Sequence, residues 1–391
     1  MVQDFFKWQD YDVKLSQTFS PASAINRKDF FVGRQAALRR VIDAVNQTGQ
    51  HIIIFGERGV GKTSLSNVIV DFLQPFSSEQ IISHRVNGFR ESSFSIIWNT
   101  FFKYLGIIVE KEDGIDLNPN DVIDNIPRDK KLILIVDEFN VIENPDVDAL
   151  FADTIKALSD FEIDTTLVVV GVADNVEDLI SEHESIDRCL VQVLLPRMSH
   201  RELIDIVEKG IKKADMSISS DAVEQICTVS LGLPHYAHAL GLASGRAAID
   251  CYRDNVIADD VNRAMSALIQ DSHQTILRSF DTAVASPRRE NLYLQVLLAC
   301  ALVPTDHLGQ FRAAAVREPF SMIMKRKYDI PAFSPHLYEL CKPERGEVLQ
   351  QFGETHNRRY RFSNPMMQPY VIMKGLDKQM IGLSDVKPKN I

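Results

Sequence analysis

Short apolar runs alternate with amphipathic stretches between residues 28 and 197. Five runs rich in isoleucine, valine and leucine have the length of buried strands, at 51–55, 81–86, 132–136, 166–172 and 190–195. Between them apolar residues recur every three or four positions, which predicts helices at 34–46, 63–73, 94–105 and 147–158. This alternation predicts an α/β fold with a three-layer core around a parallel sheet.

The pattern changes after Pro196. Four helical stretches, at 201–213, 220–230, 234–251 and 259–269, predict a helical lid over 198–283. Three more helices, at 288–302, 310–325 and 335–341, precede two strands at 348–352 and 358–362. This order is typical of a winged-helix-like domain, assigned to 284–391. Residues 1–27 are mixed and aromatic-rich and are expected to form an extended arm before the core at 28–197.

Composition and charge narrow the function. The 391 residues are 45% hydrophobic and 25% charged, as in ordinary globular proteins, with a net charge of −10. From residue 283 onward, however, 16 Lys and Arg stand against 10 Asp and Glu. An acidic body with a mildly basic end restricts any DNA contact to the C-terminal domain.

The chain shows no sign of export or of membrane insertion. No secretory signal begins it, and the apolar stretch 292–303 is too short to span a bilayer and contains Gln295. The five cysteines, which form no CxxC pair, are Cys189, Cys227, Cys251, Cys300 and Cys341. They argue against a zinc site or a disulfide framework, and we expect a cytoplasmic protein with reduced thiols.

The strongest chemical signal follows the first strand. Residues 56–63 fit the pattern GxxxxGK[ST] as Gly56, Glu57, Arg58, Gly59, Val60, Gly61, Lys62 and Thr63, with Ser64 next. Glycines let backbone N–H groups turn inward around an anion, and the following helix directs its positive end at the phosphates. In this pattern the Lys62 ammonium contacts the β- and γ-phosphates of ATP, and the Thr63 hydroxyl is a ligand of Mg²⁺.

A second signal ends the third strand. The apolar run 132–136 leads into Asp137 and Glu138, which a parallel sheet delivers to its ligand-binding edge. Asp137 is a candidate for holding Mg²⁺ through water, and Glu138 for polarising the attacking water as general base. We expect this strand to flank the strand that carries the phosphate loop.

The order of these features resembles AAA+ ATPases of the origin-recognition-like branch. The order also resembles that of signal-transduction ATPases with numerous domains (STAND), and the sequence is similar to bacterial ATP-binding proteins that have the loop sequence GERGVGKTSL. The resemblance covers about residues 19–375, and the phosphate loop and the Asp-Glu strand are its specific part. It implies an ATP- and Mg²⁺-dependent molecular switch that binds and hydrolyses ATP and forms a homo-oligomer.

The resemblance also implies roles for residues outside these two motifs. Phe31, Val32 and Gly33 resemble the hVGR segment that lines the adenine pocket, although a hydrophobic staple before a helix explains them equally well. Asp174, or Asn175 beside it, stands where the family has its first sensor, and a helix cap is the alternative. Arg188 has the position of an arginine finger, against the alternative of a surface ion pair.

Gly232, Leu233, Pro234 and His235 resemble the GxP motif of signal-transduction ATPases, in which the proline contacts adenine. Origin-recognition relatives have an arginine as the second sensor nearby, and this sequence departs from them. His235 is a candidate for a phosphate contact, and an ordinary histidine at a helix start is the alternative.

Three functions remain open at this point. The first is a switch that assembles on DNA, for which Arg358, Arg359, Arg361 and the run 325–327 supply positive charge. The second is a signalling ATPase that controls a separately encoded effector protein. The third is a nucleotide-binding scaffold with negligible turnover. The apolar segment 364–370 is either a partner surface or the last core helix.

Overall fold

A computed structural model describes residues 2–77, 80–109, 115–173, 186, 188–272, 274–286, 291–306, 308–353 and 358–387 of the chain. The chain divides into two compact units. One contains Met1–Ser23, Arg58–Val60 and Pro196–Ile391, and the other contains Ala24–Glu57 and Gly61–Leu195. Among the described residues, no helix combines the length and apolar character that crossing a membrane requires.

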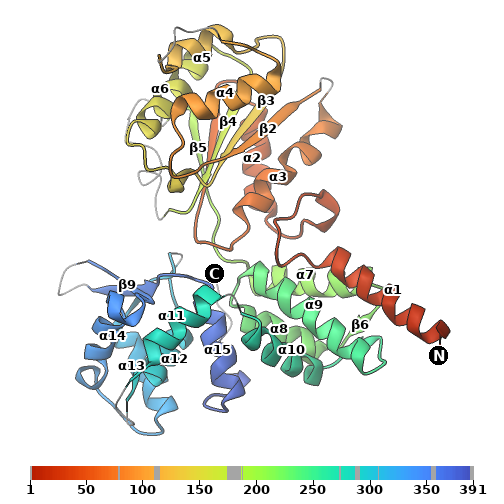
Figure 1. Cartoon of the computed structure of the whole chain (residues 1–391), viewed down its shortest axis with the longest axis vertical. Coiled ribbons are helices and arrows are strands. Elements are labelled where there is room, and N and C mark those ends of the chain that lie inside the picture. Colours follow the sequence, from red (N-terminus) through yellow and green to blue (C-terminus); the bar gives the residue numbers. More distant parts are fainter. Residues whose placement is uncertain are drawn as a thin grey trace. The chain divides into compact units, whose positions relative to one another are not determined.

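The second unit is built on a five-stranded parallel sheet (Figure 1). Its strands are β1 (His51–Phe55), β2 (Ile82–Asn87), β3 (Leu132–Asp137), β4 (Thr165–Gly171) and β5 (Leu190–Leu194), in the order β2-β3-β4-β1-β5. Every residue of β1, β3 and β4 is buried, as expected for strands covered on both faces. The predicted α/β fold with a parallel sheet is confirmed.

One expectation about the order of the strands is wrong. The strand that ends in Asp137 does not flank the strand before the phosphate loop, because β4 lies between β1 and β3. Phe55 of β1 pairs with Gly171 of β4, and Val136 of β3 pairs with Val169. The loop and the acidic pair are therefore two strand spacings apart, about 10 Å, with the end of β4 between them.

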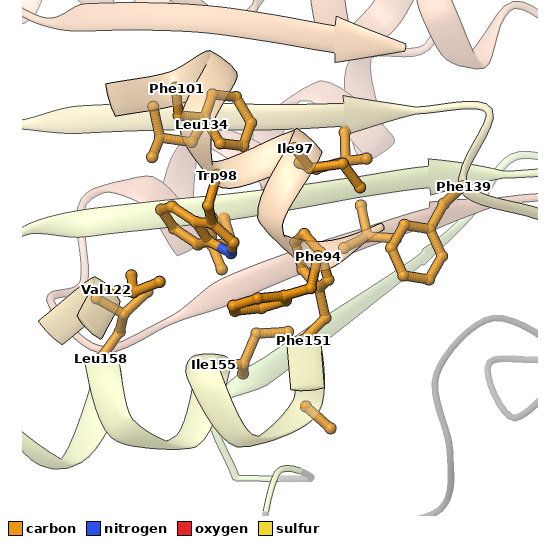
Figure 2. Packing of buried hydrophobic residues seen from close by; sticks show 14 of the residues in the cluster. Phe94, Ile97, Trp98, Phe101, Val122, Leu134, Phe139, Phe151, Ile155 and Leu158 are labelled. Atoms are coloured by element: carbon orange, nitrogen blue, oxygen red, sulfur yellow. The ribbon is translucent and has the colours of Figure 1, made fainter. Parts of the chain in front are cut away.

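Helices cover both faces of this sheet. α2 (Gln35–Val45) contacts β1 and β5, and α3 (Lys62–Leu73) contacts β4. On the other face lie α4 (Phe94–Leu105), α5 (Pro119–Asn125) and α6 (Val147–Asp160). Figure 2 shows the core on this side, where Trp98 lies among Phe94, Phe101 and Phe151. The packed core fixes the strand ends that carry the candidate site.

The first unit begins with a helix rather than an extended arm. Residues Val2–Thr18 form α1, which contacts α7 (His200–Lys213) and α9 (Pro234–Asp250). The Leu15 side chain is fully buried and packs so closely on Gly245 that an added Cβ there would lie 2.6 Å from it. The following Phe19 ring fills a notch where Gly210 and Gly241 lack side chains. Tertiary packing therefore holds this segment.

The helical stretch predicted after Pro196 is present. Besides α7 and α9 it contains α8 (Ser220–Ser230) and α10 (Ala258–Gln270), and α11 (Gln274–Val284) follows. Two short strands, β6 (Ser217–Ile218) and β7 (Asn255–Val256), form a small parallel pair that the sequence did not predict. Asp260 at the start of α10 is fully buried and forms two hydrogen bonds with Arg253.

The C-terminal part contains helices and a hairpin in the predicted order. They are α12 (Tyr293–Leu302), β8 (Phe311–Arg312), α13 (Ala313–Ile323), α14 (Ser334–Glu339), β9 (Leu349–Phe352) and β10 (Arg359–Phe362). β10 pairs antiparallel with β8 and β9. The helix predicted at 310–325 starts later because Phe311 and Arg312 form β8.

A last helix, α15 (Met367–Asp377), decides between the two interpretations of residues 364–370. Met367, Gln368 and Tyr370 are buried within the first unit, so this segment is core and not a partner surface. Gln368 accepts a hydrogen bond from Arg197 at 2.9 Å and donates one to the carbonyl of Ala301 at 2.8 Å. Gln368 thereby connects α15 to Arg197, just before the lid, and to α12.

Candidate nucleotide-binding site

The phosphate loop connects β1 to α3, which is the predicted context of strand before and helix after. Gly56 has φ 141° and Gly61 has φ 97°, values that side-chain-bearing residues rarely adopt. A Cβ on Gly56 would lie 2.4 Å from the carbonyl oxygen of Leu195. The chain therefore requires glycine at position 56 to turn out of the sheet beside the end of β5.

Lys62 is the first residue of α3, and its side chain folds back over the loop. Its Nζ donates hydrogen bonds to the carbonyl oxygens of Gly56 at 3.0 Å and Glu57 at 2.9 Å, and the residue is only 9% exposed. Gly61 is the N-cap, and no described side chain caps the helix. The first N–H groups of a helix have no intrahelical partner and attract anions, so a cation and a helix start lie together here.

The acidic pair lies at the end of β3, at the same edge of the sheet as the loop. Asp137 is 3% exposed, and its Oδ1 accepts a hydrogen bond from the backbone N–H of Glu138 at 2.9 Å. Glu138 is exposed and has a left-handed backbone, with φ 55° and ψ 37°. This conformation is uncommon for a residue with a side chain. The two carboxylates therefore differ, one buried and fixed and the other accessible.

Between the loop and the acidic pair lies the end of β4. The backbone N–H of Val172 donates to Oδ1 of Asn140 at 2.7 Å, so a side chain just beyond the acidic pair holds this strand end. Asn140 was not predicted, and its only signal in the sequence is a polar residue two positions after Glu138. Asp174 and Asn175, the candidates for the first sensor, lie outside the described residues.

Arg85 is a second residue that the sequence analysis missed. It lies in β2 next to β3, and its Nη1 is 3.6 Å from Oδ2 of Asp137 and 2.7 Å from Oδ1 of Asn67 in α3. An arginine within a predicted strand was its only signal. The pairing of β2 with β3, which brings it to Asp137, is not visible in the local sequence.

The oxygen donors of this edge suit Mg²⁺. Thr63 offers a hydroxyl and Asp137 a carboxylate, and Mg²⁺ in nucleotide sites is commonly held by one or two protein oxygens together with phosphates and water. Among the described residues there is no group of three or more His, Cys, Asp or Glu that could hold a metal by itself. Thr63 and Asp137 therefore fit Mg²⁺ that is bound together with a nucleotide.

The segment with Phe31, Val32 and Gly33 packs against the helix that follows the loop. All three residues are half-buried, and the ring of Phe31 meets that of Phe72 in α3 edge-on at 6.2 Å. Upstream, the backbone N–H of Ile25 donates to Ser64 Oγ at 3.0 Å. The segment thus lies beside the first turns of α3, while its contact with adenine stays a prediction.

Arg188 precedes β5 and is exposed on the surface. Its guanidinium pairs with Asp160 at the end of α6, and 71% of its side chain is accessible. Within one chain, this is the surface ion pair named above as the alternative. A role towards a neighbouring subunit stays a prediction.

Pro234 and His235 lie in the first unit, at the start of α9. Gly232 before them has φ 81°, and Pro234 is buried. The Nδ1 of His235 donates to the carbonyl oxygen of Pro21 at 2.9 Å. One turn later, burial and the nearby His235 lower the pKa of His238 to about 4. His235 therefore ties the segment after α1 to α9, and its phosphate contact stays a prediction.

The basic residues proposed for DNA contact are partly engaged within the chain. Arg359 forms an ion pair with Asp306 at 2.9 Å, and Arg361 lies over the ring of Phe352 and donates to Gln350. In the run 325–327, the guanidinium of Arg326 lies over the ring of Tyr328, 5.9 Å from its centroid. These contacts leave less of the positive charge available to a nucleic acid.

Comparisons with known structures give similar chains of low identity. The Thermotoga maritima RuvB Holliday junction branch migration motor is 17% identical with a TM-score of 0.46, covering 85% of this chain and 93% of that one. The Aeropyrum pernix ORC1 protein, solved in complex with DNA, is 14% identical with a TM-score of 0.49, covering 90% and 97%. Cdc6p from Pyrobaculum aerophilum is 14% identical with a TM-score of 0.48, covering 94% and 99%. Likenesses of this size do not extend to function.

A sequence comparison with curated proteins finds no match. The family model of nSTAND1, described as Novel STAND NTPase 1, matches residues 22–242. This match contains the phosphate loop, the acidic pair and the start of α9, and it spans more than half of the 391 residues. The chain therefore belongs to the nSTAND1 family of STAND NTPases.

Proposed function

We propose that this chain is an ATP-binding and ATP-hydrolysing switch whose site is formed by the phosphate loop and the acidic pair. The observation that carries the proposal is the Lys62 ammonium, held 3.0 Å from the Gly56 carbonyl oxygen at the start of a helix. A cation together with the backbone N–H groups of the first turn of a helix is an arrangement that binds phosphates.

In this proposal residues 56–64 bind the phosphates and Thr63 and Asp137 take Mg²⁺. The metal supplies positive charge that offsets the charge of the phosphates. Lys62 exchanges the carbonyl oxygens of Gly56 and Glu57 for phosphate oxygens. The Asp137 carboxylate, which the Glu138 N–H holds in place, is already oriented for Mg²⁺. Burial of Asp137 strengthens its interaction with a cation.

Glu138 is the proposed general base. Its side chain is accessible, and its left-handed backbone turns it out of the strand direction that Asp137 follows. A base must reach the water whose proton it takes, and exposure at the sheet edge supports that role. Backbone strain of this kind, about 1–2 kcal/mol, is often found at functional residues.

We further propose that nucleotide state is transmitted through the lid at 198–283 and the winged-helix-like domain at 284–391. Phe31, Val32, Gly33, Pro234 and His235 are the proposed contacts for adenine and phosphate, and Asp174 is the proposed sensor. Arg188 would complete the site of a neighbouring subunit in a homo-oligomer, which its surface exposure supports. The output would be a separately encoded effector protein, in the cytoplasm.

Contact with DNA is the less favoured branch of this proposal. Arg359 and Arg361 have intramolecular partners, and α14 carries no arginine. Proteins that bind DNA through phosphate contacts need several free Lys or Arg side chains. The second candidate function is therefore a STAND-like regulatory module with little turnover and without DNA contact.

Phosphate release and oligomer size, measured with and without duplex DNA, test this proposal. We expect ATP to increase the oligomer size and Arg188→Ala to lower turnover, with Arg201→Ala as a surface control. Turnover that needs DNA and falls steeply with salt would favour the DNA branch. ATP binding without turnover, in the presence of an intact Glu138, would favour the regulatory module.

A further inference from the structure

Arg85 lies beside the carboxylate proposed to serve Mg²⁺. In the parallel pair β2–β3, Arg85 is opposite Ile135 and Asn87 is opposite Asp137. The Asp137 side chain is 5% exposed, and its Oδ1 is engaged by the Glu138 N–H, while Oδ2 is 3.6 Å from Arg85 Nη1. The free side of this carboxylate therefore faces a guanidinium.

Asn67 holds Arg85 in this place. The Asn67 amide accepts from Arg85 Nη1 at 2.7 Å through Oδ1 and donates to the carbonyl of Ile25 at 3.2 Å through Nδ2. Ile25 in turn donates to Ser64 Oγ, next to Thr63. Asn67 and Ser64 both lie in the first turns of α3, so the guanidinium is fixed relative to the phosphate loop as well as to β3.

The contact between Arg85 and Asp137 is electrostatic. A separation of 3.6 Å exceeds that of a hydrogen bond, and the donor points to Asn67. At this range opposite unit charges still attract each other, and the burial of the Asp137 side chain limits the screening of this attraction by water. A divalent cation at Asp137 would be repelled by the same guanidinium, whereas phosphates would be attracted to it.

We propose that Arg85 is a built-in counter-cation of the nucleotide site, which neutralises Asp137 and attracts phosphates before Mg²⁺ binds. The inference rests on the proposed function of this site. Arg85 and Mg²⁺ then stabilise the same negative charge and compete for Asp137. Because coupling between two binding events is reciprocal, removal of the guanidinium makes ATP affinity depend more strongly on Mg²⁺.

The test is the dissociation constant of ATP measured by titration calorimetry in EDTA and in Mg²⁺. In Arg85→Gln, which loses the charge but keeps a hydrogen-bonding group for Asn67, we expect the ratio of the EDTA to the Mg²⁺ value to rise about three- to tenfold. Arg85→Lys keeps the charge and should retain the wild-type ratio. Asn67→Ala, which releases the guanidinium without removing it, should give an intermediate ratio.

The matched control is Arg201→Gln. Arg201 forms a comparable ion pair with Asp205, at 3.5 Å, in α7 of the other unit. In Arg201→Gln the ratio of the ATP dissociation constants in EDTA and in Mg²⁺ should equal that of the wild type. A ratio within twofold of the wild type in both Arg85→Gln and Asn67→Ala overturns the inference, as does an equal rise in Arg85→Lys. Failure of the wild type to bind ATP in either buffer would instead refute the proposed function.

Discussion

The ammonium group of Lys62 donates a hydrogen bond to the carbonyl oxygen of Gly56, with 3.0 Å between the two atoms. The side chain proposed to bind phosphate therefore forms hydrogen bonds with the backbone of its own loop. In Lys62→Ala we expect ATP affinity to fall at least about tenfold, since one charge-assisted interaction contributes about 1.5–3 kcal/mol. The unfolding midpoint should change little, and equal ATP affinity in calorimetry would contradict this role.

Gly56 should tolerate no side chain. Gly56→Ala places a Cβ 2.4 Å from the Leu195 carbonyl at φ 141°, so we expect a loss of about 2 kcal/mol or more in the free energy of unfolding. Gly106→Ala is the matched control, because Gly106 also has positive φ but no atom within 4 Å of the added Cβ. It should lose about 1 kcal/mol. Equal losses in urea denaturation would show that the close approach to the Leu195 carbonyl does not decide the cost of a side chain at position 56.

Two buried histidines should make stability depend on pH. Burial lowers the pKa of His51 to about 4, although a backbone hydrogen bond at Ile155 acts in the opposite direction. Burial, together with the nearby His235, lowers the pKa of His238 to about 4 as well. The His51 Nδ1 accepts from the Leu167 N–H at 3.0 Å, which requires the neutral ring. In the unfolded chain both histidines have a pKa near 6.5, so as the pH falls they become protonated there before they do in the folded chain.

The free energy of unfolding therefore has its full value above about pH 6.5. It decreases as the pH falls towards 4, by up to about 3 kcal/mol for each histidine. Chemical denaturation between pH 7.5 and 4.5 measures this slope. His238→Gln keeps an acceptor for the Ser20 N–H and should flatten the slope. An unchanged slope in this variant would contradict the assignment to His238.

The ion pair of Arg253 and Asp260 should stabilise the folded lid. Asp260 is fully buried, and burial favours its neutral form, but hydrogen bonds from Arg253 and the Ile257 N–H outweigh this and lower its pKa. Asp260→Ala leaves the guanidinium without this partner and should cost about 3–5 kcal/mol in urea denaturation. Asp259→Ala, an exposed neighbour in α10, is the control. Similar losses for both variants would show that the pair is unimportant.

The buried strands and the phosphate loop could be predicted because their signals are local. The runs that became β1 and β3 are apolar except for His51 at the start of β1 and Asp137 at the end of β3, and the phosphate loop is recognised by a strand, glycines and a helix that follow one another. The order of parallel strands has no such signal, because any two buried strands pair equally well on the basis of local pattern. The insertion of β4 between β1 and β3, and with it the contact of Arg85 with Asp137, therefore became visible only in the fold.

The N-terminal helix was missed for a related reason. Its polar and apolar residues give little helical periodicity, and the burial of Leu15 in this helix and of Phe19 just after it depends on Gly245 and Gly241, which are far away in the sequence. Tertiary packing overrides weak local preference in such helices. Conversely, the sequence left the apolar segment 364–370 open as a partner surface or a core helix, because the elements that bury it come earlier in the chain.

Glu138 is proposed to act as the general base for ATP hydrolysis at this site. The most direct test is single-turnover hydrolysis of bound ATP in the wild type and in Glu138→Gln, with ATP affinity measured on the same samples. We predict that Glu138→Gln binds ATP within about threefold of the wild type but hydrolyses it at least about a hundredfold more slowly, the effect of losing a general base. Equal hydrolysis rates, or no hydrolysis by the wild type at saturating ATP and Mg²⁺, would contradict the account.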